Sequence, residues 1–202
     1  HSYMKMLYKY PQAEFPYADL MAENGRRSFD DFEYELLDTG VFAEDRYFDV
    51  FVEYAKADQE DILMKITVVN RGPESADCHL LPTLWFRNTW SWGYDKGPMG
   101  DVEGKPQLLQ IEGSKDVSVV KAEHPAAGTY YLYAERADEM LFTENETNSE
   151  AIYGLANATP YAKDSFHRYL INGETTAVNP ERVGTKVAAV FNKKIASGES
   201  VT

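Results

Sequence analysis

The sequence predicts a mainly β fold, an antiparallel β-sandwich with a few short helices, on three observations. Apolar and polar residues alternate in several short runs, and Gly, Pro, Asn or Asp clusters bound these runs at regular spacing. Apolar residues make up 44% of the 202 positions, which is enough to fill a buried core. We therefore expect a single β-sandwich domain over residues 1–202.

The clearest alternation predicts three consecutive antiparallel strands at residues 46–54, 61–69 and 76–86. A polar, hairpin-like link at residues 55–60 and a turn at residues 70–73 join them, and short links favour a meander. Four further strands are expected at residues 107–112, 117–122, 129–134 and 186–195.

Helices are expected outside these strands. Residues 1–30 predict a helical or irregular lead-in, with one helix at residues 1–10 before Pro11 and another at residues 17–24 before Gly25. A third helix is expected to begin near Thr159-Pro160 and to end at Asn172-Gly173.

The charge and the absence of sorting signals restrict the partners. A formal net charge of −13 disfavours nucleic acid and anionic membrane surfaces, because like charges repel. No apolar run approaches the roughly 18 residues of a membrane span, and no signal peptide is visible. Cys78 is the single cysteine, which excludes an internal disulfide. These features favour a cytoplasmic location.

The two ends predict a piece of a longer protein. The chain begins at His1 without an initiator methionine, and its last residues follow a turn signal at residues 197–199. We expect a domain that is truncated at both ends.

No motif for catalysis, metal or cofactor binding is found. Phosphate-binding glycine loops and the G-x-S-x-G nucleophile elbow are absent, and His79 and His124 lack a second ligand at metal-binding spacing. The 33 acidic residues form no pair that local spacing would select for glycoside hydrolysis. We therefore expect no metal, no cofactor and no catalytic residue. Asn145-Glu146-Thr147 and Asn157-Ala158-Thr159 match the N-glycosylation pattern.

One segment concentrates aromatic and polar side chains at the end of a predicted strand. Its candidate residues are Trp85, Arg87, Asn88, Trp90, Trp92 and Tyr94. Aromatic rings and arginine are typical of interfaces, and the same rings can stack on sugars. Three interpretations stay open: core tryptophans, a docking surface for another domain, and an oligosaccharide site.

Several strings carry a resemblance to a known family. They are residues 1–12 (HSYMKMLYKYPQ), 15–17 (FPY), 34–40 (YELLDTG), 46–50 (RYFDV), 70–74 (NRGPE), 84–90 (LWFRNTW), 177–180 (AVNP) and 184–186 (GTK). Together they resemble the N-terminal region of bacterial glycoside hydrolase family 63 proteins, the relatives of processing α-glucosidase or mannosyl-oligosaccharide glucosidase.

The resemblance implies an N-terminal super-β-sandwich joined to a C-terminal (α/α)6 barrel. It implies inverting hydrolysis of α-glucosidic bonds by a general acid and a general base on that barrel, which is absent from residues 1–202. No catalytic residue of the family can be carried onto this chain. The resemblance therefore implies a non-catalytic domain whose partner is the catalytic domain of the same protein.

Two further hypotheses stay open. The chain could be a free-standing carbohydrate-binding module that uses Trp85, Trp90 and Trp92, or an enzyme with a carboxylate pair that local spacing does not reveal.

Overall fold

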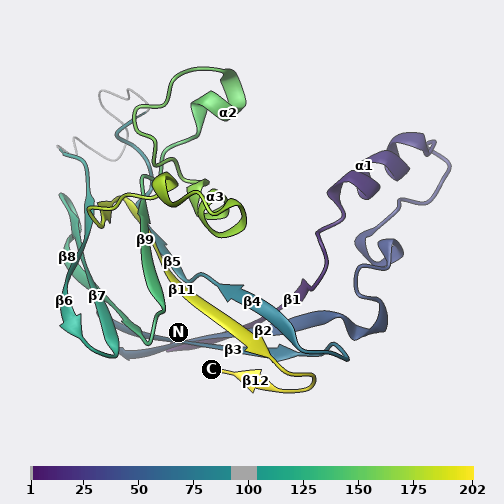
Figure 1. Ribbon diagram of the computed structural model, residues 1–202, viewed down its shortest axis with the longest axis horizontal. Coiled ribbons are helices and arrows are strands. Elements are labelled where there is room, and N and C mark those ends of the chain that lie inside the picture. Colours follow the sequence, from purple (N-terminus) through teal and green to yellow (C-terminus); the bar gives the residue numbers. More distant parts are fainter. Residues whose placement is uncertain (1, 92–103) are drawn as a thin grey trace. The chain divides into compact units, whose positions relative to one another are not determined.

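The computed structural model describes residues 2–91 and 104–202 (Figure 1). It is mainly β, with three antiparallel sheets and a few short helices, so the predicted fold class is confirmed. The chain divides into two compact units, one of His1–Cys78 with Lys193–Thr202 and one of His79–Asn192.

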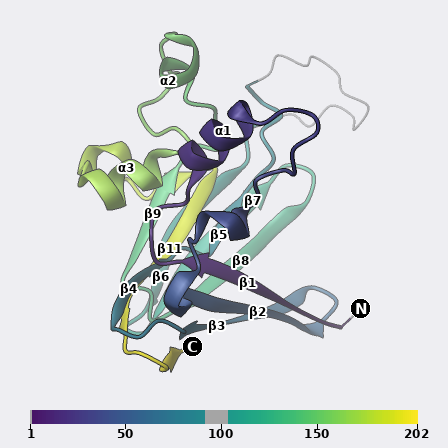
Figure 2. The ribbon, with the colours of Figure 1, turned by 90° about the vertical axis from the view of Figure 1, so that its right-hand side faces the viewer.

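The first unit contains a four-stranded sheet. Its strands are β1 (Tyr3–Pro11), β2 (Tyr47–Asp58), β3 (Asp61–Asn70) and β12 (Ser200–Val201), in the order β1-β2-β3-β12 (Figure 2). The predicted antiparallel pair β2 and β3 is confirmed. The turn between them is shorter than expected, because β2 continues to Asp58.

The prediction of a helix at residues 1–10 was wrong, because this segment is β1. Its side chains alternate between the two faces of the sheet, as any strand requires, and those at odd positions contact β2. The Tyr3 hydroxyl donates a hydrogen bond to Glu53 at 2.6 Å, and Lys9 Nζ lies 2.6 Å from Asp49. These partners lie some 40 or more positions away in the chain, outside any local sequence window.

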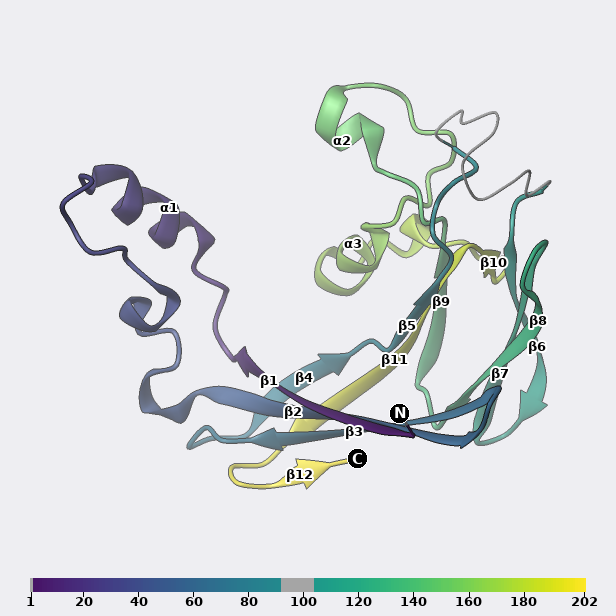
Figure 3. The same cartoon turned by 180° about the vertical axis from the view of Figure 1, so that it is seen from behind.

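Residues 13–45 form an arm between β1 and β2. It contains α1 (Tyr17–Arg26) and two short 3₁₀ helices, η1 (Leu36–Thr39) and η2 (Ala43–Asp45) (Figure 3). The predicted helix at residues 17–24 is confirmed, with Gly25 inside it rather than after it. Asn24 ties the arm together, since its side chain donates to the Tyr34 carbonyl and accepts from the Tyr34 amide, both at 2.8 Å.

Asn70 is the most connected polar side chain of the first unit, and it is fully buried. Its Nδ2 donates to the carbonyls of Glu74 (2.7 Å) and Ile195 (2.9 Å). Its Oδ1 accepts from Gln12 Nε2 (2.6 Å) and from the Gly72 amide (2.8 Å). One amide therefore joins the end of β3, the turn that follows it, the segment after β1 and the segment before β12.

Asp49 is a buried carboxylate held between two cations. Lys9 Nζ lies 2.6 Å from one oxygen and Arg71 Nε lies 2.7 Å from the other. Burial would raise the pKa of Asp49, but the hydrogen bonds from Lys9 and Arg71 outweigh it and the pKa is lowered. The charged form is therefore the one that the fold stabilises.

The second unit pairs two sheets. One contains β10 (Val183–Gly184), β6 (Gln107–Ser114), β7 (Val117–His124) and β8 (Gly128–Glu135) in that order. The other contains β11 (Lys186–Ile195) and β5 (Thr83–Trp85), with β9 (Glu139–Thr143) also paired to β11. β4 (Ala76–Leu80) also pairs with β11, and the boundary between the two units falls within both of these strands. The predicted strands at residues 107–112, 117–122, 129–134 and 186–195 are confirmed.

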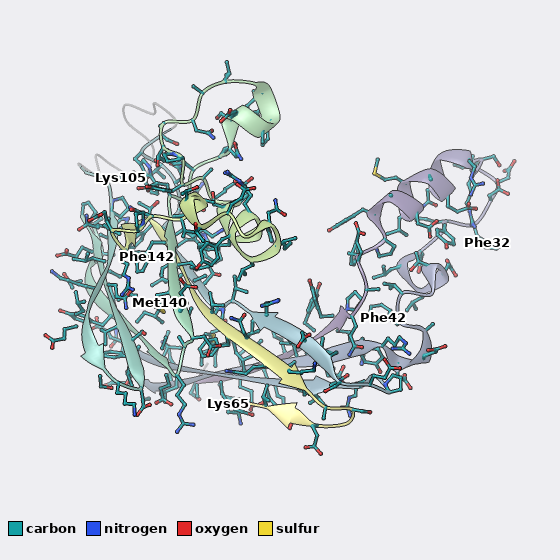
Figure 4. The ribbon with its side chains drawn as sticks, in the orientation of Figure 1. Phe32, Phe42, Lys65, Lys105, Met140 and Phe142 are labelled. Carbon is teal, nitrogen blue, oxygen red and sulfur yellow. The ribbon has the colours of Figure 1, made fainter. Side chains whose placement is uncertain are left out.

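Alternate side chains of β9 and β11 point to opposite faces of their sheet and contribute to two separate apolar clusters. Met140 and Phe142 lie on the side of β9 that faces β6–β8 (Figure 4), where they pack with Leu108 and Val120. The alternate residues Leu141, Ala188 and Val190 pack with Phe166 of α3 (Ser165–Asn172), which lies on the opposite side of these strands (Figure 1). Sheet, sheet and helix therefore form three layers within this unit.

The predicted strand at residues 76–86 is two strands, β4 and β5, separated at Leu81-Pro82. Proline has no amide hydrogen for the ladder, although the Pro82 carbonyl still accepts from the Ala189 amide at 3.0 Å. Both strands pair with β11 rather than β3, so the expected three-stranded meander was wrong beyond its first pair.

The remaining elements differ from expectation at their ends. The helix predicted from residue 159 begins only at Ser165, and it ends as predicted before Gly173, whose φ is 70°. The strands β9 and β10, the helix α2 (Ser149–Tyr153) and the 3₁₀ helix η3 (Thr175–Ala177) were not predicted.

We predict that Asp49→Asn lowers the free energy of unfolding at neutral pH by about 1–2 kcal/mol, because the ion pairs with Lys9 and Arg71 are lost. The loss is modest because both cations are nearly half exposed, so that water partly screens the two pairs. The pKa of Asp49 is lower in the folded chain than in the unfolded chain, where it is about 3.9. The stability that Asp49 contributes is therefore fully present at pH values above the unfolded pKa, and it is lost as the pH falls through the folded pKa. Urea unfolding from neutral to acidic pH measures it. The exposed control Asp77→Asn should follow the wild type, and an unchanged acid limb in Asp49→Asn would contradict the assignment.

Candidate functional site

The predicted aromatic segment begins at the end of β5. Trp85 is its last residue, lies opposite Lys186 of β11, and is 55% exposed. Arg87 is also exposed, two residues further along the chain. Both side chains are therefore accessible to a partner.

Asn88 is only 6% exposed and is used locally. Its Nδ2 donates to Ser91 Oγ at 2.6 Å, and its Oδ1 accepts from the Ser91 amide at 3.2 Å. This pattern is a side-chain turn that fixes the backbone after β5. Both polar atoms of the Asn88 side chain therefore bond to Ser91 within the chain and are not free for a ligand.

Trp90 is partly buried and anchored by a carboxylate. Its indole Nε1 donates to Glu146 Oε1 at 2.7 Å. Lys105, labelled in Figure 4, places its Nζ 3.4 Å from the same oxygen and 5.8 Å from the centre of the indole. Glu146 therefore holds residues on both flanks of segment 92–103. The candidates Trp92 and Tyr94 lie outside the described residues.

A second carboxylate shares the same lysine. Lys105 Nζ lies 2.9 Å from Glu144 Oε2, which also accepts a hydrogen bond from Thr185 Oγ1 at 2.6 Å. The Glu144 and Glu146 side chains are 17% and 15% exposed, respectively. We call Trp90, Lys105, Glu144, Glu146 and Thr185 the Glu144–Glu146 cluster.

The chemistry of the Glu144–Glu146 cluster is that of an anchor. Each carboxylate accepts one hydrogen bond from a neutral donor, Trp90 or Thr185, and forms an ion pair with the single lysine, which offsets part of the paired negative charge. Glycoside hydrolysis instead needs two carboxyl groups on either side of a sugar ring. Within residues 2–91 and 104–202, no group of three His, Cys, Asp or Glu side chains is placed to hold a metal ion.

Both glycosylation motifs have their acceptor nitrogen in use. Asn145 Nδ2 donates to the Phe86 carbonyl at 2.9 Å, and Asn157 Nδ2 donates to Asn148 Oδ1 at 2.9 Å. Asn157 Oδ1 also accepts from the Ser149 amide at the start of α2. These side chains serve as structural donors and caps in the folded chain.

A second candidate surface lies on the arm, where large apolar side chains are uncovered. Phe29 and Phe32 are 101% and 93% exposed, and none of the α1 residues is buried; Figure 4 labels Phe32 at the far end of the arm. The residues that we group as the arm surface are Tyr17, Met21, Phe29, Phe32 and Leu37. Large apolar side chains exposed to this degree are typical of interaction sites.

Sequence reasoning did not select the arm surface. The signal was present, because its apolar residues fall in a segment without strand alternation, whose one α-helix has no buried residue. Among the helices of the described part of the chain, none is both long and apolar enough to cross a bilayer.

The whole chain is similar to the uncharacterized protein YMR196W of Saccharomyces cerevisiae. The two are 35% identical over 228 residues, which cover 100% of this chain and 21% of that protein. The chain thus spans about a fifth of the length of this relative. No family model matches the sequence. No solved structure matches it either.

We predict that Glu146→Ala releases Trp90, because the indole N–H loses its acceptor and Lys105 loses one partner. The free energy of unfolding should fall by about 1–2 kcal/mol, and tryptophan emission should shift to the red as the indole gains water. Chemical unfolding followed by fluorescence measures both. The control Glu150→Ala, an exposed position on α2, should change neither, and equal effects in the two variants would rule out the anchoring role.

Proposed function

We propose that this chain is the non-catalytic β-sandwich part of a larger carbohydrate-processing enzyme, an α-glucosidase similar to glycoside hydrolase family 63. In this proposal it docks onto the catalytic (α/α)6 domain of the same protein. The observation that carries the proposal is the arm surface, in which five large apolar side chains are at least 70% exposed.

The arm surface needs a partner for an energetic reason. Covering one phenylalanine-sized side chain is worth about 1.5–3 kcal/mol, so burying Phe29 and Phe32 alone would favour docking by several kcal/mol. Leaving such side chains in water favours aggregation instead. A covalently linked domain is a suitable partner, because a shared chain raises the effective concentration of the two surfaces.

The non-catalytic role is supported by the Glu144–Glu146 cluster. These two carboxylates converge on one lysine and are held by Trp90 and Thr185, so they act as fixed acceptors in the fold. The length of the yeast relative, of which this chain matches 21%, supports a larger host protein. The sequence strings given above supply the class of that host.

A second candidate function is a carbohydrate-binding module, which one observation favours. Trp85 is 55% exposed at the end of β5, two residues before the exposed Arg87, and an indole face with a nearby donor suits a sugar ring. Trp85→Ala would then abolish a fluorescence change on titration with gluco-oligosaccharides.

We predict that Phe29→Ser with Phe32→Ser leaves the melting temperature of the 202-residue chain nearly unchanged, because both side chains are already exposed. The same pair of changes should reduce self-association of the chain and lower the melting temperature of the longer protein. Calorimetry and sedimentation of both proteins provide the measurement. The control Phe142→Ala, only 1% exposed, should cost about 3–5 kcal/mol in either protein. Equal stability of the longer protein with and without the arm changes would refute the docking role.

We also predict that the 202-residue chain alone releases no product from p-nitrophenyl α-glucoside, whereas the longer protein does. Glu144→Gln and Glu146→Gln in the longer protein should leave the pH profile of kcat unchanged, because neither group donates or accepts the transferred proton. Turnover by the short chain that Glu144→Gln abolishes would show that the chain carries its own catalytic pair.

A further inference from the structure

The outward face of the sheet β10-β6-β7-β8 carries two adjacent tyrosines. On β8, Leu132 and Ala134 point inward and join the core with β9 and β11. Tyr131 and Tyr133 occupy the alternate positions and therefore point away from that core. β8 is the last strand in the order of this sheet, so the pair lies along its edge.

The two rings form a nearly continuous surface. Their centroids are 6.4 Å apart with planes tilted by 34°, and the residues are 50% and 65% exposed. Neither hydroxyl has a hydrogen-bond partner among the residues that the structure describes. By contrast, the hydroxyls of Tyr3, Tyr34 and Tyr169 each donate to a carboxylate.

Polar groups border the tyrosines on the neighbouring strand. Lys121 lies opposite Tyr131 and Val119 lies opposite Tyr133 in the antiparallel register. Lys121 Nζ is 2.7 Å from Glu123 Oε1, and this hydrogen bond raises the pKa of Lys121. Donors and acceptors therefore lie beside two amphipathic rings on the outward face of the sheet.

We propose that Tyr131 and Tyr133 form a binding platform for a neutral glycan chain, on the outer face of this sheet. Two successive pyranose rings would lay their C–H faces on the two tyrosines, while their hydroxyls reach Lys121, Glu123 and the tyrosine hydroxyls. Rings with one apolar face and one polar tip suit a ligand that is apolar on its face and polar at its edge.

The charges of this face favour a neutral ligand. Lys121 is the single cation at the outward positions of β7 and β8, and it is already paired with Glu123. The next outward residue of β8 is Glu135, and the whole chain carries −13. An anionic polysaccharide would meet repulsion there without an unpaired cation to bind it.

The tyrosine pair has two alternative roles, which the same experiment separates from glycan binding. The rings could serve only to cover Val119, which is 8% exposed, and their removal would then cost stability. The edge of β8 could instead pair with a second copy of the chain, and the rings would then control its mass in solution.

The choice of a glycan rests on the proposed function, but the platform shares no residue with the arm surface and does not include Trp85. Binding lost in Tyr131 and Tyr133 variants addresses the platform alone. The docking role depends on Phe29 and Phe32 in the longer protein. Failure of one proposal is therefore distinguishable from failure of the other.

The test is calorimetric titration of the 202-residue chain with maltoheptaose and with cellohexaose, alongside an anionic carboxymethyl glucan. Wild type should bind at least one neutral oligosaccharide, and Tyr131→Ala and Tyr133→Ala should each weaken that binding by about tenfold or more. Tyr133→Phe should restore most of it, because the stacking ring is kept. The control is Tyr130→Ala, on the same strand, 48% exposed and on the other side, which should bind as wild type does.

Four results would overturn the proposal. The first is that the wild type binds neither neutral oligosaccharide, and the second is that both alanine variants bind as tightly as the wild type. The third is that the anionic glucan binds more tightly than the neutral oligosaccharides. The fourth is that Tyr130→Ala loses as much glycan affinity as the Tyr131 and Tyr133 variants do. Melting curves and sedimentation accompany each variant. A loss of stability or a change of mass without any loss of glycan affinity would assign the tyrosines to packing or to self-association.

Discussion

Strand β11 is the constraint on which the second unit depends, because it is buried on both faces. Its consecutive residues Val187, Ala188, Ala189 and Val190 are at most 2% exposed. One set of alternate side chains faces β6–β8, and the other faces α3. The two alanines allow both layers to approach, so a larger side chain at either position would force them apart. β5 and β9 take their register from this strand, and β4 also pairs with it.

Long-range polar contacts define the first unit, where the buried apolar residues are fewer. The Asn70 amide and the Asp49 carboxylate each join segments that are distant in sequence. A buried polar group that loses one partner keeps its desolvation cost, so these groups disfavour alternative arrangements more than they add net stability. The same logic applies to the Glu144–Glu146 cluster, whose carboxylates fix the backbone around β5 and β9 by accepting hydrogen bonds.

The sequence allowed the strands with strong periodicity to be predicted, because their pattern is local. β2, β3, β6, β7, β8 and β11 follow from alternation or from a short apolar run bounded by turn residues. β1 was misassigned because its methionines, tyrosines and lysines do not alternate as a clear apolar and polar pattern, and its register depends on β2, whose paired residues lie 36 to 52 positions away. The pairing partner of β4 is likewise distant in sequence, because β4 pairs with β11 and not with the preceding strand β3. For the site, the tryptophan segment could be located, but Glu144, Glu146 and Lys105 could not be assigned to it without the fold.

The position of β1 at the edge of its sheet bears on how the chain behaves in concentrated solution. An uncovered edge strand offers its backbone to other molecules, and lysines along such an edge are a known means of preventing that pairing. β1 carries Lys5 and Lys9, whose ammonium groups lie over the rings of Phe51 and Tyr47. Lys9 is paired with Asp49, so Lys5 is the cation that two molecules approaching edge to edge at β1 would bring together. Extension of a sheet through the β1 edge is therefore disfavoured, whereas the β8 edge carries no lysine to oppose it.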